Sequence, residues 1–439
     1  MRITVIGTGY LGAVHAACMA EIGHEVLGVD VDELKIAALA EGRPPFFEPG
    51  LADLLARTHA GGRLRFSTSL REAAEFGEVH FVCVGTPQRS GSFAADLSHI
   101  DAVVDGLGPH LSEPCLVVGK STVPVGTAAR LAGRVADLAP AGDAAELAWN
   151  PEFLREGTAV RDTLEPDRLV VGTGSARADA MLREVYAPMI EAGTPYLVTD
   201  LATAELVKVA ANSFLATKIS YVNAMAEICE ATGADVTRLA EAIGLDDRIG
   251  SRFLSAGLGF GGGCLPKDIR AFLARGEELG VERSLRFLRE VDEINMRCRQ
   301  RTVDAARDLV GGSFLGKRIA VLGAAFKPDS DDIRDSPALN VAAVIKLQGA
   351  HITVHDEEAV DNARAAFPHL DYALEPAKAC EGADAVLHLT EWRQYRELDP
   401  ARLAAVTRTP RLLDARNALD LPHWRNAGWT VRALGRPAA

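Results

Sequence analysis

The strongest constraint on the fold of this chain is a glycine-rich turn close to its beginning. Residues 2–6 form a β-branched run, and the motif Gly7-Thr-Gly9-Tyr-Leu-Gly12 follows at once. A helical pattern then covers residues 13–22, and residues 24–30 have the composition of a second strand. A dinucleotide-binding βαβ unit requires this order of strand, turn, helix and strand. Gly7 would permit the tight turn, Gly9 the approach of a pyrophosphate, and Gly12 the packing of helix on strand.

The acidic residue at the end of the second predicted strand indicates which dinucleotide binds. Asp30 lies 23 residues after Gly7, where a carboxylate can accept hydrogen bonds from the adenosine ribose. The same carboxylate would repel the 2′-phosphate of NADP, so we expect NAD. Lys35 is compatible with the same ribose region or with a solvated position on a helix.

Further strands of the first half end in small or hydroxyl-bearing residues. The runs 79–84 and 115–119 are buried-type strands followed by Gly85-Thr86 and by Ser121-Thr122. Strand ends of this kind are expected to line a cofactor crevice. Glu152 and Glu156 come later, in a loop bounded by Pro and Gly, where they are suited to acid–base chemistry or to the start of a helix.

A long helical pattern covers residues 202–233 and carries two polar residues on one face. Lys208 and Asn212 are four positions apart, which places them one turn apart on a helix. They form a candidate site; alternatively, Glu205 pairs with Lys208 at the surface. A second helix is predicted over residues 284–309. This all-helical stretch between two α/β halves suggests a spine that also supplies a dimer interface.

The stretch with the most pronounced chemical character is residues 259–268, Gly-Phe-Gly-Gly-Gly-Cys-Leu-Pro-Lys-Asp. Three consecutive glycines before Cys264 add no side-chain burial and give a backbone that a ligand can approach closely. Lys267 and Asp268 place charges near the sulfur, and a nearby cation favours the reactive thiolate. Cys264 is therefore a candidate nucleophile, with a tight loop around an inert buried thiol as the alternative.

A second strand-first pattern begins near residue 316. Strands are expected at 318–322 and 351–355 with a helix at 337–348 between them, capped by Ser336 and Pro337. Further strands are expected at 385–389 and 411–414. The predicted fold is α/β, with two Rossmann-like doubly wound domains joined by a long central helix and a helical dimerisation region. The expected domains are an NAD-binding domain (1–200), a central helical domain that carries the Cys264 loop (201–310) and a C-terminal Rossmann-like domain (311–439), to which the family resemblance described below gives the binding of a UDP-sugar.

Composition excludes several classes of partner. The 439 residues carry a net charge of −13, which argues against nucleic acid or an anionic membrane surface. Seven scattered cysteines show no CxxC spacing, so neither a disulfide framework nor a metal site is expected. We expect no signal peptide and no membrane span, and we expect the protein to be cytoplasmic.

Taken together, these segments resemble the UDP-glucose/GDP-mannose dehydrogenase family, and within it the UDP-glucose 6-dehydrogenases. The resemblance covers nearly the whole chain. The segments that carry the resemblance, each given with the number of its first residue, are GTGYLG at 7, STVPVGT at 121, NPEFLREGTA at 150, ELVKVAANSFLA at 205, DDRIGSRFLSAGLGFGGGCLPKD at 246, AFKPDSDDIRDSP at 325 and LLDARNAL at 412. It implies oxidation of the sugar C6 alcohol of UDP-glucose to a carboxylate, while two NAD are reduced, in a homodimer.

The resemblance also implies roles for individual residues. Cys264 matches the nucleophile that traps the aldehyde, and Arg248 an arginine supplied across the dimer interface. The other positions implied to take part in catalysis are Lys208, Asn212, Asp268, Thr122 and Glu152. The implied NAD contacts are Gly7, Gly9, Leu11, Gly12, Asp30, Lys35, Thr86, Thr122, Glu156, Lys267 and Arg334. The implied substrate contacts are Glu152, Phe153, Leu154, Arg155, Lys208, Asn212, Arg248, Phe253, Leu254, Ser255, Ala256, Gly257, Gly261, Lys327 and Arg416.

Three other functions fit parts of the same pattern. A GDP-mannose dehydrogenase would use the same machinery. A single-step hydroxyacid or sugar-acid dehydrogenase would need the Lys/Asn pair without a nucleophilic cysteine. An NAD-sensing regulator would keep the fold without the chemistry, and against it every nominated catalytic residue is present.

Overall fold

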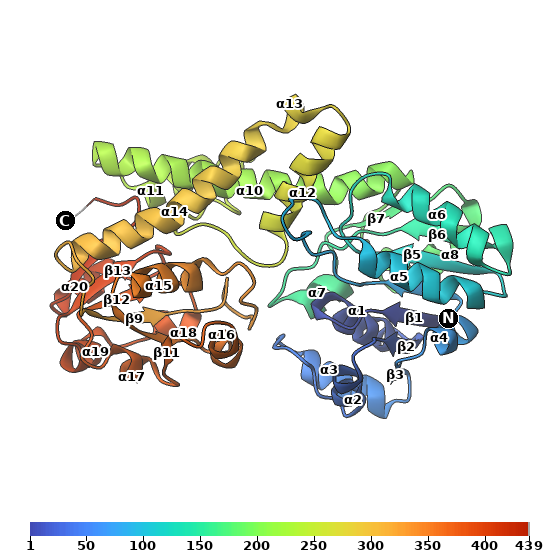
Figure 1. Ribbon diagram of the computed structural model, residues 1–439, viewed down its shortest axis with the longest axis horizontal. Coiled ribbons are helices and arrows are strands. Elements are labelled where there is room, and N and C mark those ends of the chain that lie inside the picture. The colour runs from blue at the N-terminus through green and yellow to red at the C-terminus, as the bar shows by residue number, and fades with distance from the viewer. Residues whose placement is uncertain (438–439) are drawn as a thin grey trace. The chain divides into compact units, whose positions relative to one another are not determined.

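The computed structural model describes residues 1–437, which form two compact units (Figure 1). Unit 1 comprises Met1–Ala211 and Arg270–Gly280, and unit 2 comprises Asn212–Ile269 and the chain from Val281 onward. The chain passes between the units three times: within α10 (Leu201–Thr232), within α12 (Leu265–Glu278) and between Gly280 and Val281. The three predicted domain ranges remain a prediction.

Unit 1 is built on one eight-stranded sheet of order β3-β2-β1-β4-β5-β6-β7-β8. All neighbouring pairs are parallel except β6 and β7, which meet antiparallel at Trp149 and Gly172. The strands are β1 (Arg2–Ile6), β2 (Glu25–Val29), β3 (Leu64–Ser67), β4 (Val79–Val82), β5 (Cys115–Gly119), β6 (Ala145–Trp149), β7 (Leu169–Gly172) and β8 (Tyr196–Thr199). The first six strands have the order of a dinucleotide-binding sheet.

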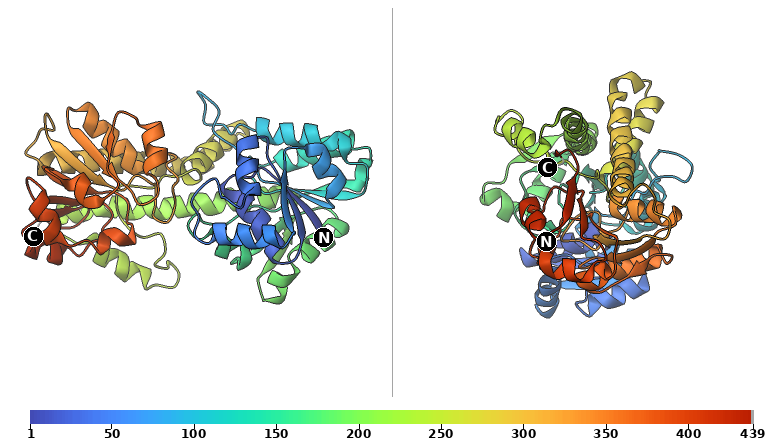
Figure 2. Two further views of the ribbon diagram at one scale, coloured as in Figure 1. Left: turned by 90° about the horizontal axis from the view of Figure 1, so that it is seen from below. Right: turned by 90° about the vertical axis from the view of Figure 1, so that its left-hand side faces the viewer.

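Helices lie on both faces of this sheet, as the edge-on view of Figure 2 shows. Because both faces are covered, β4 and β5 are buried at every residue and read in the sequence as continuous apolar runs. The helices are α1 (Tyr10–Glu21), α2 (Glu33–Ala40), α3 (Leu51–Ala60), α4 (Leu70–Phe76), α5 (Ser98–Leu107), α6 (Thr127–Leu138), α7 (Ala159–Leu164), α8 (Ala176–Val185) and α9 (Ala187–Glu191).

Unit 2 contains a second parallel sheet, of order β11-β10-β9-β12-β13-β14. Counted from its own first strand, this order repeats that of unit 1, so both predicted Rossmann-like folds are confirmed. The strands are β9 (Arg318–Leu322), β10 (His351–His355), β11 (Asp371–Tyr372), β12 (Ala385–His388), β13 (Arg411–Asp414) and β14 (Thr430–Ala433). The helices around this sheet are α15 (Pro337–Leu347), α16 (Val360–Ala366), α17 (Pro376–Cys380), α18 (Arg393–Arg396), α19 (Pro400–Val406) and α20 (Leu421–Asn426).

The caps of α15 agree with the sequence prediction. The Ser336 side chain accepts a hydrogen bond from the Leu339 N–H, and Pro337 is the first helical residue. Both features stabilise a helix start, because the hydroxyl satisfies a free donor and the proline lacks one.

The helical part of the chain between β8 and β9 contains α10, α11 (Val236–Gly244), α12, α13 (Glu282–Leu285) and α14 (Phe287–Leu309). The helix predicted over 284–309 is divided, because α13 ends at Leu285 and α14 begins at Phe287. In residues 1–437 no helix is both long and apolar enough to cross a membrane.

Candidate active site

The first part of the candidate site lies where β1 and β2 of unit 1 end. Gly7 has φ +93, a left-handed conformation that favours glycine. A Cβ on Gly12 would come within 1.7 Å of the Gly7 carbonyl oxygen, so only glycine lets α1 pack this closely on the turn. A Cβ on Gly9 would meet nothing within 4 Å. Gly9 therefore faces open space, and α1 begins directly after it, which fits a site for a pyrophosphate.

The carboxylate of Asp30 is fixed beside this turn. Its Oδ2 accepts hydrogen bonds from Thr8 N (2.8 Å), Thr8 Oγ1 (3.0 Å) and Lys35 Nζ (2.9 Å). Burial raises the pKa of Asp30, but the Lys35 ammonium and the backbone N–H groups of Thr8 and Asp32 outweigh burial and lower it below its usual value. Asp30 is therefore ionised at neutral pH, and the Lys35 ammonium pairs with it; the predicted contact of Lys35 with a ribose stays a prediction.

A second part of the site lies at the ends of β4, β5 and β6. The Thr86 hydroxyl donates to the carbonyl oxygen of Thr122 at 2.8 Å, which joins the loops after β4 and β5. Glu152, in the loop after β6, accepts from the backbone N–H groups of Phe153 (2.8 Å) and Leu154 (2.9 Å). Its other oxygen pairs with Lys120 Nζ at 2.9 Å.

Two residues of the same loop have partners within unit 1. The guanidinium of Arg155 forms a bidentate pair with Asp162, at 2.8 and 2.7 Å. Glu48 accepts from the N–H groups of Gly157 (2.6 Å) and Ala159 (2.7 Å), at the start of α7. The loop is therefore anchored on both sides of Glu156.

The alternative role considered for Glu205 is wrong. Glu205 is 2% exposed, and it accepts hydrogen bonds from Gly126 N (2.7 Å) and Ala128 N (2.6 Å) at the start of α6. Burial raises its pKa, and the three backbone N–H groups of residues 126–128 oppose that shift. Lys208, one turn later, instead places its ammonium 5.3 Å from the centre of the Phe153 ring.

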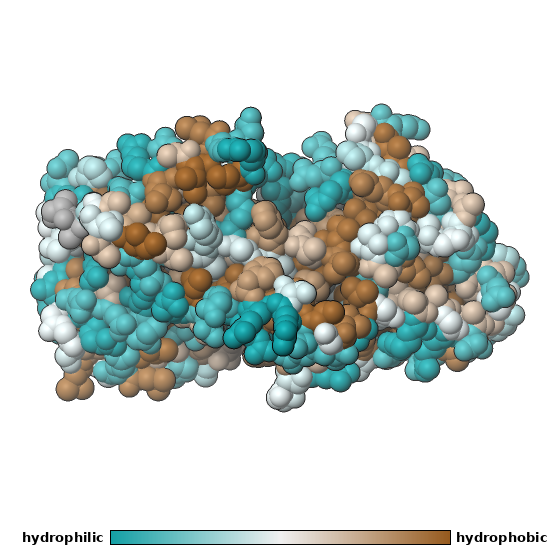
Figure 3. Space-filling model, turned by 90° about the horizontal axis from the view of Figure 1, so that it is seen from above, coloured by the Kyte–Doolittle hydropathy of each residue, from teal (hydrophilic) through white to brown (hydrophobic). Residues whose placement is uncertain are grey.

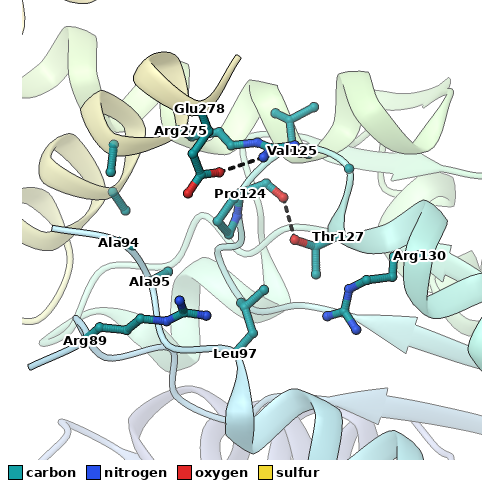
Figure 4. A pocket seen from close by; sticks show the side chains of 13 residues that line it. Arg89, Ala94, Ala95, Leu97, Pro124, Val125, Thr127, Arg130, Arg275 and Glu278 are labelled. Carbon is teal, nitrogen blue, oxygen red and sulfur yellow. Dashed lines mark hydrogen bonds and ion pairs between the residues drawn. The ribbon is translucent and has the colours of Figure 1, made fainter. Parts of the chain in front are cut away.

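The segment that follows Thr122 is also held from α12, at the pocket shown in Figure 4. Arg275 donates to the carbonyl oxygen of Val125 through Nε (3.1 Å) and Nη2 (2.8 Å), and its Nη1 donates to Glu278. Thr127 Oγ1 closes the turn by donating to Pro124 O at 2.6 Å. Glu205 and Arg275 thus fix the position of the loop that carries Thr122.

In unit 2, Cys264 is exposed and lies immediately before the first residue of α12. The Asp268 N–H donates to the Cys264 carbonyl oxygen at 3.0 Å, so the two residues are one helical turn apart. Cys264 thus lies at the positive end of the dipole of α12, where a negative charge is favoured.

Asp268 is 2% exposed and links two other predicted residues. It accepts from Asn212 Nδ2 at 2.6 Å and from Lys267 Nζ at 2.6 Å. A buried carboxylate with two such partners is satisfied electrostatically. The structure therefore brings Asn212 of α10 together with Lys267 and Asp268, which lie on the helix turn that follows Cys264.

The glycines before Cys264 have a structural explanation that the sequence did not reveal. A Cβ on Gly261 would lie 2.3 Å from the Asp335 carbonyl oxygen, and one on Gly262 would lie 2.7 Å from the Phe326 ring. A Cβ on Gly263 would lie 2.4 Å from the Arg334 guanidinium carbon. We expected the glycines to leave room for a ligand. The space left by their missing side chains is instead occupied by residues 326 and 334–337 of unit 2.

The predicted substrate segment 253–257 packs on the loop after β13. The N–H of Gly257 donates to Asn223 Oδ1 at 2.8 Å, and a Cβ on Gly257 would lie 2.6 Å from the Ala415 carbonyl oxygen. Phe253 has φ +64, a rare conformation for a residue with a side chain. Leu254 and Ala256 are buried in an apolar cluster with residues of α10 and with Val236 of α11.

Arg416, at the end of β13, ties several loops together. It donates to the carbonyl oxygens of Leu389 (2.8 Å), Gly259 (3.2 Å) and Phe326 (3.2 Å). The neighbouring Lys327 places its ammonium 5.7 Å from the centre of the Phe326 ring. Arg248 is separate from this cluster within its own chain: its side chain is 88% exposed, and it pairs with Asp246.

Comparison with known proteins agrees with this geometry. The UDP-glucose/GDP-mannose dehydrogenase family matches through three models: its NAD binding domain at residues 1–190, its central domain at 202–297 and its UDP binding domain at 320–421. The chain belongs to this family. The predicted dehydrogenase class and the NAD cofactor are thereby confirmed.

Members of the UDP-glucose/GDP-mannose dehydrogenase family match the chain over its full length. It is 42% identical to a UDP-glucose 6-dehydrogenase of Rhizobium meliloti (strain 1021), over 100% of both chains. It is 39% identical to the UDP-glucose 6-dehydrogenase TuaD of Bacillus subtilis (strain 168), over 100% of this chain and 94% of TuaD. A solved UDP-glucose dehydrogenase from Pyrobaculum islandicum matches with a TM-score of 0.89 and 38% identity, over 98% of both chains.

Sequence reasoning missed the contacts by which Lys120, Glu205 and Arg275 hold the loops of the candidate site. The partners of Glu205 and Arg275 are backbone groups 77 to 150 positions away in the chain, and no local pattern marks them. Lys120 had a detectable signal, because a lysine directly after a fully apolar strand is unusual.

The geometry at Asp30 predicts strong cofactor selectivity. We expect kcat/KM for NAD to exceed that for NADP by about 100-fold or more, and Asp30→Asn to reduce this ratio by at least about 10-fold. Because the pKa of Asp30 is lowered, its charge persists, and the ratio should stay constant between about pH 7.5 and 8.5, where the 2′-phosphate of NADP is also fully ionised.

The matched control for this prediction is Asp32→Asn. Asp32 caps α2 by accepting from Leu34 N and Lys35 N, and asparagine caps equally well. Asp32→Asn should therefore leave the ratio of kcat/KM for NAD to kcat/KM for NADP unchanged. Comparable kcat/KM for NAD and NADP in the unaltered enzyme would contradict the assignment.

Proposed function

We propose that this chain is an NAD-dependent UDP-glucose 6-dehydrogenase that oxidises UDP-glucose to UDP-glucuronate through a covalent intermediate on Cys264. The observation that carries the proposal is the exposed Cys264 at the start of α12, one turn before the buried Asp268 that holds Asn212 and Lys267. The full-length similarity to two UDP-glucose 6-dehydrogenases supports this substrate.

The reaction removes four electrons from the sugar C6 carbon. One sugar CH₂OH, one water and two NAD⁺ give one carboxylate, two NADH and three protons, each NAD⁺ accepting one hydride. A free aldehyde has no tetrahedral carbon from which a second hydride can leave, so a nucleophile must add to it first. Cys264 supplies that nucleophile: its sulfur adds to the aldehyde carbon to give a thiohemiacetal.

The second oxidation leaves a thioester on Cys264, which water must then cleave. Water adds to the thioester carbon, and the carbon–sulfur bond breaks to return the thiolate. Asp268 accepts protons or orients the water in this step, since its carboxylate lies one helical turn from Cys264. Asn212 has one amide hydrogen on Asp268 and a second that can donate to the developing oxyanion.

The remaining predicted residues bind the two ligands in this proposal. Gly7, Gly9, Leu11, Gly12 and Asp30 hold the adenosine and pyrophosphate of NAD, and Thr122 and Glu156 lie at the nicotinamide side. Phe253–Gly257, Gly261, Lys327 and Arg416 contact the sugar nucleotide, in the part of the chain that matches the family's central and UDP binding domains. Lys208 and Glu152 act at the sugar.

GDP-mannose remains the second candidate substrate, because the same family oxidises it. We favour UDP-glucose because the family model at residues 320–421 is a UDP binding domain and both relatives are UDP-glucose enzymes. We place the enzyme in the cytoplasm, since all seven cysteines are free thiols.

The catalytic unit in this proposal is a homodimer. The exposed apolar side chains Phe214, Tyr221 and Ile228 of α10 recur every seven residues and therefore form one stripe on the helix, open to solvent by 66%, 51% and 54%. Figure 3 shows brown apolar patches on a surface that is otherwise mostly teal. Such a stripe fits burial against a second copy, and the exposed Arg248 can reach the partner's substrate.

The substrate proposal is tested with purified protein, NAD and a panel of nucleotide sugars. UDP-glucose should give the highest kcat/KM, and Cys264→Ser should lower turnover by about 1,000-fold or more because serine is a weak nucleophile without an adjacent base. NAD and UDP-glucose binding should survive in Cys264→Ser, since only one atom of an exposed loop changes. Near-normal turnover by Cys264→Ser would show that the thiol has no chemical role.

The dimer proposal is tested by mixing Arg248→Ala with Cys264→Ser. If Arg248 acts in the partner's site, a mixed dimer has one site with both residues, so a random mixture should recover about a quarter of normal activity. If Arg248 acts in its own chain, no site in the mixture is complete. A mixture no more active than either variant alone would contradict the proposal.

A further inference from the structure

A buried cluster of polar groups lies at the ends of β5 and β6, around the assigned residue Glu152. Its centre is Lys120, which is 4% exposed. The Lys120 ammonium lies 2.9 Å from Glu152 Oε2, 3.0 Å from Asn150 Oδ1 and 3.5 Å from Tyr186 Oη. All three donor positions of the ammonium are therefore used.

The partners of Lys120 are themselves fixed. Tyr186 Oη donates to Asn150 Oδ1 at 2.6 Å, and Asn150 Nδ2 donates to the Val170 carbonyl oxygen at 2.8 Å. Glu152 accepts from two backbone N–H groups through Oε1 and from Lys120 through Oε2. Its side chain is 17% exposed, so the remaining acceptor capacity of the carboxylate faces outward.

Four other titratable groups around this pair are uncharged at neutral pH, and the carboxylates of Glu48 and Glu21 act on one of them, Cys18. His15 and Cys18 lie on α1, Cys83 follows β4, and Tyr186 follows α8. Burial lowers the pKa of His15 well below its usual value and raises the pKa of Cys83 and of Tyr186 to about 12; it also raises the pKa of Cys18 strongly. Lys120 and Glu152 are thus the two charges of the cluster, and each compensates the other.

We propose that Lys120 is a positioning residue that keeps Glu152 ionised and in one orientation, so that Glu152 offers substrate or water a constant hydrogen-bond acceptor. The inference rests on the proposed function for its catalytic consequence, and on the buried pair alone for its effect on stability.

The electrostatics of the pair agree with this role. Burial raises the pKa of Glu152, but the Lys120 ammonium and the N–H groups of Leu154 and Phe153 lower it by more, so the net pKa is below the usual value. Burial likewise lowers the pKa of Lys120, and Glu152 reverses that shift and raises it above its usual value. Without Lys120, burial would dominate and the pKa of Glu152 would rise.

The test uses Lys120→Met, which removes the charge and keeps a side chain of similar length. In the variant the buried carboxylate is unpaired at pH 8 and becomes neutral by protonation as the pH falls. Its melting temperature should be at least about 5 °C below that of the unaltered protein at pH 8, and the gap should narrow by about half or more at pH 5.5. This readout does not depend on turnover, so it tests the pair even if the substrate assignment fails.

The catalytic consequence is measured as a pH profile. In Lys120→Met the acid limb of kcat/KM for UDP-glucose should move upward by at least about one pH unit, because Glu152 must now be deprotonated at higher pH. Lys120→Arg keeps the charge and should restore the normal position of the acid limb, even where kcat is reduced.

Tyr186→Phe is the matched control, because it removes a hydrogen bond of the same cluster and leaves both charges. It should lower the melting temperature by the same amount at pH 8 and pH 5.5 and leave the acid limb in place. If Lys120→Met does not fold, Lys120→Met/Glu152→Gln removes both charges and should fold, with a melting temperature gap that is independent of pH.

Three outcomes would overturn the inference. The first is a melting temperature gap for Lys120→Met that is the same at both pH values. The second is an unchanged acid limb in that variant. The third is a double variant that is no more stable than Lys120→Met. This would show that the unpaired Glu152 charge does not cause the loss of stability in Lys120→Met.

Discussion

Parallel pairing of strands in the order 3-2-1-4-5-6 is the constraint on which the candidate site depends. Parallel strands all end at the same edge of a sheet, so residues far apart in sequence meet there. In unit 1 this edge collects Gly7, Asp30, Thr122 and Glu152, which follow four different strands. In unit 2 the corresponding edge carries the loops that contain Phe326, Leu389 and Arg416. The Arg416 side chain donates hydrogen bonds to the other two loops.

Much of this fold could be predicted from the sequence, because buried parallel strands have an unambiguous pattern. The runs at 115–119, 318–322, 351–355 and 411–414 match strands of the structure residue for residue. The long helix at 202–233 also matches, within one residue at each end. The break between α13 and α14 was missed, because Arg286 has nothing in its local sequence that ends a helix.

The candidate site was less predictable, because its groups are held by contacts over long distances in sequence. Glu205 illustrates this: its spacing to Lys208 suggested a surface pair, whereas its carboxylate is buried against the start of α6. The three glycines before Cys264 illustrate the same limit. The sequence indicated their conformational freedom. It did not indicate that residues 326 and 334–337 pack against them.

The charges of the site are arranged so that each buried carboxylate has a cationic or N–H partner. Asp268 has Lys267 and Asn212, Glu152 has Lys120, and Asp30 has Lys35 and Thr8. At Glu152 and Asp30 these partners lower the pKa of the carboxylate below its usual value, although burial alone would raise it. Cys264 differs from the other six cysteines, which are buried: it is exposed and lies at the start of a helix.

The central claim is that Cys264 makes one active site perform two oxidations on the same carbon. The most direct test is to let the enzyme consume a limiting amount of UDP-glucose completely in excess NAD and to count the NADH formed. The account predicts two NADH per UDP-glucose, with UDP-glucuronate as the product and no free aldehyde. One NADH per UDP-glucose, with the aldehyde released, would contradict it.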